Sequence, residues 1–295
     1  LLSHPHTSAG RVPTDFGYRV YVNELLKPRP VKARERAQIE ASLQAAPGSI
    51  EEALRDACAA LAQITGYPAV ATLPSARRDS VRHVQLNAVP PRRLLLALVT
   101  QSGRIENRLF DVAEDVTAAH LNTVVNFLNQ KLAGLSISSL RALQFADVSA
   151  GLHGEGVLTL ASRAFDFVRQ SAGELNDEQV VVQGMVTLLN EPEFSDIGEA
   201  RAAMKLFEDR VMLADVLRAP FHNAQVEGYA VVIGREHSGE NVAVQRFSLV
   251  GIAYGVGGQV LGSVGVMGPT RMKYADAVSI VPALAARLQD SLEAW

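Results

Sequence analysis

The chain has 295 residues, of which 48% are hydrophobic and 20% charged, and its formal net charge is −3. These values fit an ordinary globular protein of two or three domains and exclude a polybasic coat protein for nucleic acid. The charge is unevenly distributed, because residues 1–36 carry seven Lys and Arg against three Asp and Glu, a net +4, which leaves −7 for the remainder. A basic N-terminal end on an acidic body is expected when that end contacts phosphate and the body does not.

Cysteine content and hydropathy indicate the compartment. Cys58 is the only cysteine, which excludes an intrachain disulfide and is typical of a reducing cytosol. No apolar run approaches the roughly 18–20 residues that a bilayer-spanning helix needs, and no segment is recognisable as a signal peptide. We therefore expect a cytoplasmic protein.

Residues 1–13 are predicted to form two short extended pieces around a turn. Pro5 and Pro13 disfavour a helix there, and the small residues 8–10 suit a tight bend. A short hairpin close to the N-terminus is the expected result.

Two helical segments follow this hairpin. Thr14 is a suitable cap for a helix that runs to about Leu26. Residues 31–65 carry a second helical pattern, which is interrupted at Pro47-Gly48 and ended by Gly66-Tyr67-Pro68.

The rest of the chain alternates between strand and helix patterns. The apolar run Leu94–Thr100, a turn at Ser102-Gly103 and a second strand Ile105–Phe110 predict a hairpin. Further strand patterns lie at 67–74, 81–89, 179–189, 229–234, 247–255 and 259–269. Helical patterns lie at 116–132, 162–172, 199–218 and 274–292.

This order of elements predicts an α+β fold. The simplest arrangement is one α+β domain whose two strand-rich halves pair in a single sheet, with a mostly helical segment inserted between them. The apolar faces of 116–132 and 204–217 are candidates for a dimer seam, although core burial and interface burial use the same residue types.

The sequence offers no catalytic, metal or cofactor site. A P-loop is absent, and Gly255–Val260 lacks the third glycine of a dinucleotide fingerprint and leads into a strand, so a hairpin turn is expected there. His4 and His6 alone cannot hold a metal ion. Paired carboxylates such as Glu51-Glu52 lie where a helix start favours negative charge. We expect no enzyme activity and no cofactor.

The N-terminal hairpin has the composition of a DNA-binding wing. Small residues let the backbone approach phosphate, and a single Arg can enter the narrow minor groove. Hydroxyl and backbone N–H groups fix register on DNA without reading bases. The alternative is an ordinary surface hairpin with an incidental Arg. The candidate DNA-binding residues are His4, His6, Thr7, Ser8, Gly10 and Arg11 of the wing, together with Arg19 on the following helix.

Two long motifs resemble one known family. Residues 1–26, "LLSHPHTSAGRVPTDFGYRVYVNELL", closely resemble the N-terminal signature of the HrcA family of bacterial heat-inducible transcription repressors. Residues 262–281, "GSVGVMGPTRMKYADAVSIV", resemble the C-terminal signature of that family. Because the intermediate stretches "ITGYPAVATLP" and "LLNEPEFSDI" also look similar, the resemblance covers essentially the whole chain in one order.

The resemblance implies a winged helix-turn-helix, a GAF-like domain and a dimerisation domain inserted into the latter. The expected ranges are 1–27 for the wing and following helix, 28–66 for linker helices, 67–113 and 223–295 for the two parts of the GAF-like domain, and 114–222 for the insert. The family's recognition helix is expected to precede Leu1, so the chain is expected to be N-terminally truncated and to lack most base-specific affinity as it stands.

The resemblance also implies a function. Members of the family bind an inverted-repeat operator, called CIRCE, as homodimers and repress chaperone operons. Their activity is coupled to the GroEL chaperonin, which helps keep the repressor folded, so that repression falls when unfolded proteins occupy the chaperonin. The alternative is a small-molecule-sensing GAF-type regulator with no chaperonin coupling.

Four further residues have expected structural roles. Tyr18 and Tyr21 are expected to pack the domain more than to contact DNA. In the segment "GPTRMKY", residues 268–274, Thr270 suits a helix cap and Arg271 an internal ion pair with an acidic residue, which favours a structural role over a ligand site.

Overall fold

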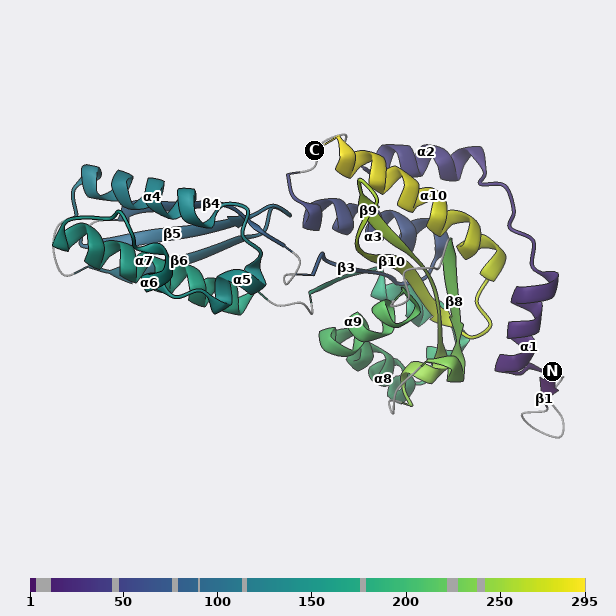
Figure 1. The fold of residues 1–295 in the computed structure, drawn as a ribbon. Helices are drawn as coiled ribbons and strands as arrows, with labels where there is room; N and C mark the ends of the chain where they lie inside the picture. Colours follow the sequence, from purple (N-terminus) through teal and green to yellow (C-terminus); the bar gives the residue numbers. More distant parts are fainter. Residues whose placement is uncertain are drawn as a thin grey trace. The chain divides into compact units, whose positions relative to one another are not determined.

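The computed structural model describes residues 1–3, 12–43, 48–75, 79–89, 91–112, 116–175, 179–221, 228–237 and 242–294. They divide into two compact units (Figure 1). The first unit consists of Leu1–Leu73 with Glu178–Trp295, and the second of Pro74–Asp177. The second unit is therefore an insertion in the sequence of the first.

The first unit begins with a short strand pair. β1 (Leu2–Ser3) pairs antiparallel with β2 (Val12–Pro13) through the partners Leu2↔Pro13 and Ser3↔Val12. The two predicted extended pieces are confirmed, and residues 4–11 between them lie outside the described part of the chain.

A helix follows β2 directly. α1 (Asp15–Val20) continues as one π-helical turn, η1 (Tyr21–Leu25). The Thr14 hydroxyl accepts a hydrogen bond from the Gly17 N–H at 3.1 Å, which satisfies an amide that a helix start leaves unpaired. The predicted helix, with its cap and its end near Leu26, is confirmed.

Two more helices precede the first long sheet. α2 (Ala33–Ser42) and α3 (Ile50–Thr65) lie on either side of the predicted interruption. Ser49 caps α3 by accepting from the Glu52 N–H at 3.1 Å. Gly66 ends α3 in a left-handed conformation, with a φ of 75°, which glycine adopts without the steric cost of a Cβ.

A five-stranded antiparallel sheet forms the centre of the first unit, in the strand order β7–β3–β10–β9–β8. In chain order its strands are β3 (Ala69–Thr72), β7 (Val180–Gln183), β8 (Tyr229–Ile233), β9 (Phe247–Val256) and β10 (Gln259–Pro269). Short 3-10 turns connect parts of this unit: η2 (Met185–Asn190), η3 (Pro192–Phe194), η4 (Ala219–Phe221), η5 (Gly234–Glu236) and η6 (Val244–Arg246).

Helices cover both faces of this sheet (Figure 1). α3 and α10 (Tyr274–Glu293) pack on one face, in a core that contains Ala71. α8 (Ile197–Glu208) and α9 (Arg210–Arg218) pack on the other, in a core that contains Val70. Adjacent residues of β3 thus enter different cores, because successive side chains of a strand face opposite sides of the sheet.

The inserted unit combines a three-stranded sheet with helices. In chain order its elements are β4 (Val81–Val89), β5 (Arg93–Thr100), β6 (Ile105–Asp111), α4 (Ala118–Leu132), α5 (Ile137–Ala142), α6 (Phe145–Val148) and α7 (Glu155–Glu174), with the strands antiparallel in the order β4–β5–β6. The central strand buries Leu94, Leu96 and Leu98 in a core shared with α4 and α7. Leu95 and Val99, on the opposite face, are only partly buried.

The prediction that both strand-rich halves pair in one sheet is wrong. Only β3 of the first half joins the C-terminal strands, and β4–β6 form a separate sheet. The alternating leucines of β5 need a covering layer on one face, and the helices that follow in the chain supply it. The inserted unit, residues 74–177, therefore contains most of the range 67–113 that was expected to begin the GAF-like domain and only part of the expected insert 114–222. Residues 179–221 belong to the first unit. The α+β class is confirmed, while the GAF-like and dimerisation assignments stay predictions.

Most other predicted elements are confirmed with changed bounds. The hairpin of β5 and β6 is present, and α7 extends the predicted helix at 162–172 in both directions. The helix predicted at 199–218 is divided at Asp209, whose carboxylate accepts from the Met212 N–H at 3.0 Å and so caps α9. The strand predicted at 179–189 ends at Gln183, because η2 follows.

Arg29 joins the segment after η1 to two helices. Its guanidinium donates to both carboxylate oxygens of Glu35 in α2, at 2.7 and 2.8 Å, and to Asp276 in α10. The Arg29 and Glu35 side chains are 22% and 13% exposed, so solvent screens this pair little. The hydrogen bonds from Arg29 lower the pKa of Glu35 from 4.5 to about 2.

We expect Glu35→Gln to remove a pH-dependent part of the folding stability. A carboxylate whose pKa is lowered by folding stabilises the protein fully above its unfolded value, near 4.5, and loses this contribution as the pH falls toward 2. The variant should lose about 1 kcal/mol of unfolding free energy at pH 7, and this difference should shrink below pH 4.5. Urea unfolding at several pH values measures it.

Glu51→Gln is the control, because Glu51 pairs with Arg55 on α3 and both side chains are more than half exposed. Such surface pairs contribute little. A Glu35→Gln difference that does not change with pH would contradict the assignment.

Candidate nucleic-acid interface

The wing residues predicted from the sequence lie between β1 and β2 along the chain. His4, His6, Thr7, Ser8, Gly10 and Arg11 lie outside the described residues, so their DNA-binding role stays a prediction. Arg19 is described and lies in α1, directly after this hairpin. The part of the candidate interface that the structure describes is therefore α1 and the residues that it contacts.

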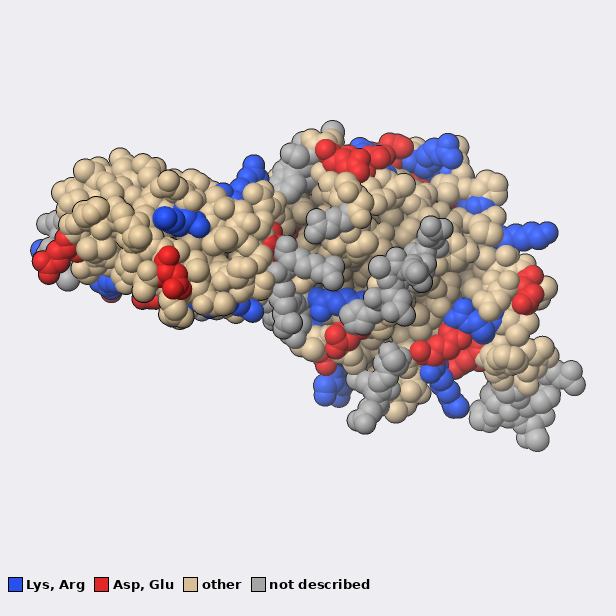
Figure 2. Space-filling view, viewed as in Figure 1, with Lys and Arg blue, Asp and Glu red and all other residues tan. Residues whose placement is uncertain are grey.

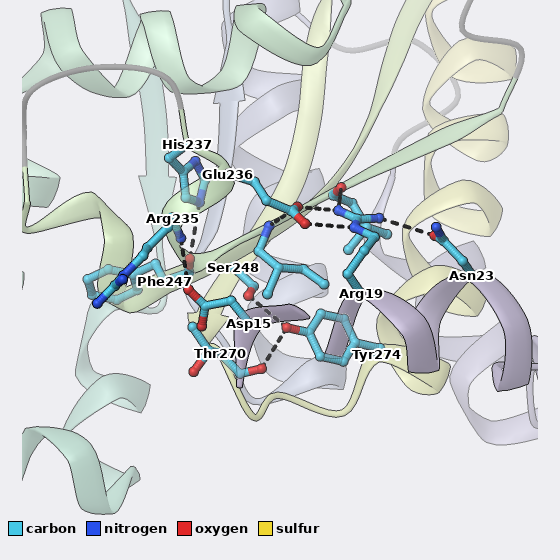
Figure 3. A network of polar contacts seen from close by, with 12 residues as sticks. Asp15, Arg19, Asn23, Arg235, Glu236, His237, Phe247, Ser248, Thr270 and Tyr274 are labelled. Carbon is cyan, nitrogen blue, oxygen red and sulfur yellow. Dashed lines mark hydrogen bonds and ion pairs between the residues drawn. The ribbon is translucent and has the colours of Figure 1, made fainter. Parts of the chain in front are cut away.

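One face of α1 is docked on η5, the turn that follows β8 (Figure 3). Asp15 and Arg19 are four residues apart and so lie on the same side of the helix. Asp15 Oδ2 accepts a hydrogen bond from the Arg235 backbone N–H at 3.0 Å. Arg19 Nε donates to Glu236 Oε1 at 2.8 Å, and its Nη2 donates to the other oxygen of the same carboxylate. This bidentate geometry is the strong form of an Arg–carboxylate contact.

The remaining donors of Arg19 also contact protein. Nη2 donates to the Val231 carbonyl at 2.7 Å, and Nη1 donates to Asn23 Oδ1 at 3.4 Å. The Arg19 side chain is 25% exposed and that of Glu236 34%. The structure thus places the predicted phosphate contact Arg19 in a network with the body of the first unit, and its role at DNA stays a prediction.

Glu236 is positioned for this contact by its own turn. Its Oε2 also accepts from the Ile233 backbone N–H at 2.8 Å. Burial raises the pKa of this carboxyl group, but the hydrogen bonds from Arg19 and Ile233 outweigh burial, so the pKa is lowered overall. Glu236 is therefore held as the carboxylate that Arg19 requires.

Gly234 permits the close approach of α1. Its φ is 52°, and a Cβ at this position would overlap the Asp15 carboxylate. A residue with a side chain would meet both the steric cost of the left-handed backbone and this overlap. A side chain at this position would therefore have to displace the Asp15 carboxylate from its place beside the turn.

Aromatic packing supports the same contact. The rings of Tyr18 in α1 and Tyr274 in α10 lie 5.8 Å apart between centroids. The Tyr274 hydroxyl donates to the Thr270 carbonyl at 2.6 Å and accepts from Ser248 Oγ at 2.7 Å (Figure 3). The prediction that Tyr18 packs the domain is confirmed, whereas Tyr21 is 38% exposed.

Comparison with known proteins identifies the family. The family model "HrcA protein C terminal domain" matches residues 51–278. The heat-inducible transcription repressor HrcA of Desulforudis audaxviator is 32% identical over 292 residues, which cover 99% of this chain and 83% of that protein. The proteins of that name from Moorella thermoacetica and Mycobacterium leprae are both 32% identical, over 294 and 295 residues, with the same shares covered. The chain belongs to the HrcA family.

A solved structure shares the fold of this HrcA chain. The crystal structure of a hypothetical protein, at 2.2 Å resolution, has a TM-score of 0.62 at 20% identity, and the match covers 99% of this chain and 82% of that one. At this identity the likeness concerns the fold alone.

The segment 268–274 of the HrcA chain has a structural role. Arg271 donates to Glu193 and, at 2.8 Å, to Glu191, which confirms the predicted internal ion pair with acidic residues. The prediction of Thr270 as a helix cap is wrong, because a turn places it four residues before Tyr274, where α10 begins. Its carbonyl instead accepts a hydrogen bond from the Tyr274 hydroxyl.

Several small cavities lie in the first unit. One of about 170 Å³ is lined by Val216, Ala219, Pro220, Val232, Glu236 and His237, and others of about 190 and 270 Å³ lie beside α8 and α10. Among the described residues, no group of three or more His, Cys, Asp and Glu is placed to hold a metal ion. Cys58 is buried, which raises the pKa of its thiol. Within the same residues, no helix is both long and apolar enough to cross a bilayer.

The residues of η5 were not predicted from the sequence. The only local signal is the opposite charge of Asp15 and Arg19 one helical turn apart, which indicates a polar face but no partner. The Arg19–Glu236 contact joins residues 217 positions apart, so only the folded chain reveals it.

We expect Gly234→Ala to destabilise the protein more than Gly257→Ala. Gly257, in the turn between β9 and β10, has a similar φ of 57°, but a Cβ there meets nothing within 4 Å. Both variants should lose about 1 kcal/mol to backbone strain, and only Gly234→Ala should also displace the Asp15 carboxylate. Urea unfolding of both variants measures the difference.

Adding Asp15→Ala should recover most of the extra loss in Gly234→Ala, because it removes the group that the new methyl overlaps. Equal losses in the two glycine variants would contradict the close packing of α1 on η5.

Proposed function

We propose that this HrcA family member is a repressor of heat-shock chaperone operons that binds an inverted-repeat operator of the CIRCE type. The observation that carries the proposal is the match over 99% of the chain to proteins named heat-inducible transcription repressors. The "GRVPTDFGYR" and "GPTRMKY" motifs support it from opposite ends of the chain.

The DNA contact is assigned to the N-terminal segment as part of a winged helix-turn-helix. Support comes from the antiparallel pairing of β1 and β2 on either side of residues 4–11, and from the net +4 of residues 1–36. On the face drawn in Figure 2, by contrast, basic and acidic side chains are interspersed over the first unit. A basic segment attached to a mixed surface localises affinity for phosphate.

The body is assigned to a GAF-like domain with an inserted dimerisation domain. A palindromic operator requires a two-fold symmetric protein. The seam candidates drawn from the sequence bury most of their apolar residues internally, with Val124 and Leu128 of α4 in the core of the inserted unit and Leu213 of α9 in that of the first. Met204 and Val211 are exceptions, at 38% and 48% exposed.

We therefore assign the seam to the open sheet face, which we define as Leu95, Ala97, Val99, Ile105 and Leu109 of β5 and β6. Ile105 pairs with Val99 and Leu109 with Leu95, so these side chains lie side by side on one face. Ile105 is 59% exposed and Leu109 47%. An apolar face of this kind fits a second copy of the chain.

Coupling to a GroEL-type chaperonin completes the proposal, with the chaperonin maintaining the folded repressor. The alternative, a small-molecule-sensing GAF-type regulator, would need a cavity of about 300 Å³ or more for a typical ligand. The three cavities given above, which described residues form, have volumes of about 170 to 270 Å³, so none of these three is assigned to a ligand. No catalytic activity is part of the proposal.

We expect Arg11→Ala in the full-length protein to weaken binding to an inverted-repeat duplex. The slope of log affinity against log salt concentration should become shallower by about one, the value for one phosphate contact. Fluorescence anisotropy at four salt concentrations measures both, and sedimentation of the complex should give two copies of the chain per duplex.

Arg55→Ala is the control, since this exposed arginine lies on α3 and pairs with Glu51. Absence of binding to inverted repeats by the unsubstituted protein at every salt concentration would contradict the proposed function. Unchanged affinity and salt dependence in Arg11→Ala would contradict the wing assignment alone.

A further inference from the structure

We propose that Asp15 and Arg19 are positioning residues that fix the DNA-binding segment on the body of the repressor, and that η5 is the receptor built for them. The inference rests on the proposed function and assigns to Arg19 a role other than phosphate contact. It concerns how the DNA-binding segment is held on the body. In a dimer, this determines the separation of the two DNA-binding segments.

The Arg19 guanidinium is already engaged by protein. It makes four hydrogen bonds, two to Glu236 and one each to Val231 and Asn23, out of the five N–H donors that an arginine has. A phosphate that took the two donors now bonded to Glu236 would have to displace this carboxylate, which also accepts from the Ile233 N–H. The arrangement suits a fixed joint better than a mobile contact.

The shape of η5, and not only its charge, fits α1. Gly234 leaves room for the Asp15 carboxylate, and the Arg235 N–H donates to it. Because η5 directly follows β8, which pairs with β9 through Ile233↔Ser248, its place is set by the sheet. The helix therefore receives its position from the rigid centre of the first unit.

The segment is also held beyond α1. Arg29, after η1, bonds to Glu35 and to Asp276 in α10. Contacts at both ends leave α1 little freedom to rotate on the body. Since a dimer reads two half-sites at a fixed separation, a fixed joint in each copy would impose a preference for one spacer length.

The two roles of Arg19 predict opposite effects of removing Glu236. If Arg19 contacted phosphate, Glu236 would compete with DNA, and Glu236→Gln would tighten binding. If Arg19 positions the segment, the same substitution loosens the joint and weakens binding.

The test is a charge swap, measured as the Kd for an inverted-repeat duplex in the full-length protein. We expect Arg19→Glu and Glu236→Arg to weaken binding by about tenfold or more, equivalent to the loss of a charge-assisted hydrogen bond. The double variant keeps the net charge and restores an ion pair, but the new carboxylate would face the Val231 carbonyl and the new guanidinium the Ile233 N–H. Binding should therefore recover in part, to a Kd clearly below that of either single variant. The salt dependence of affinity should stay unchanged in Glu236→Gln, because no phosphate contact is lost.

The spacer gives a second readout. The unsubstituted repressor should discriminate against an operator whose spacer is longer by roughly five base pairs, half a helical turn. Glu236→Gln should reduce this discrimination. The matched control reverses the exposed pair Glu51 and Arg55 on α3, for which neither Kd nor spacer preference should change.

Tighter binding by Glu236→Gln, or a double variant as weak as Arg19→Glu, would overturn the inference. If the unsubstituted protein binds no inverted repeat, the proposed function fails, and the joint is then tested on the free protein. There the unfolding midpoints of Arg19→Ala, Glu236→Ala and their combination should be non-additive, and additive losses would overturn the joint.

Discussion

The contact between α1 and η5 is the constraint on which the arrangement of the N-terminal segment depends. Two side chains of one helical turn meet three residues of the body, through the backbone N–H of Arg235, the carboxylate of Glu236 and the carbonyl of Val231. The partners are more than 200 positions apart in sequence. The first residues of the chain are thereby attached to η5, and the N-terminal segment belongs to the same compact unit as the sheet.

The sheet explains why η5 can serve this purpose. β8 is an edge strand, and its pairing with β9 sets the position from which the turn departs. On one face α3 and α10 bury that sheet, and from α10 Tyr274 reaches Ser248 and packs on Tyr18. Packing, register and hydrogen bonds therefore agree on one position for α1. The inserted unit forms the connection between β3 and β7, and these two strands still pair with each other. An insertion of this size is therefore compatible with an intact sheet.

Features determined locally were predictable from the sequence. The Thr14 cap, the glycine end of α3 and the β5–β6 hairpin follow from propensity or turn chemistry. Features that depend on distant partners were not. The apolar run of β5 predicts a buried strand but does not show that only one of its faces is covered or by which layer, and nothing near Arg19 identifies Glu236. The wing residues from His4 to Arg11 stay predictions, carried by motif and composition.

Hydrogen exchange of the α1 amides in the free, full-length protein tests the central claim most directly. Exchange through local opening reports the free energy of releasing a segment. If the Glu236 contact holds α1 on the body, the amides of residues 17–22 should exchange at least about tenfold faster in Glu236→Gln, a change of about 1.4 kcal/mol in opening, while those of α3 keep their rates. Equal exchange of α1 in the two proteins would contradict the account.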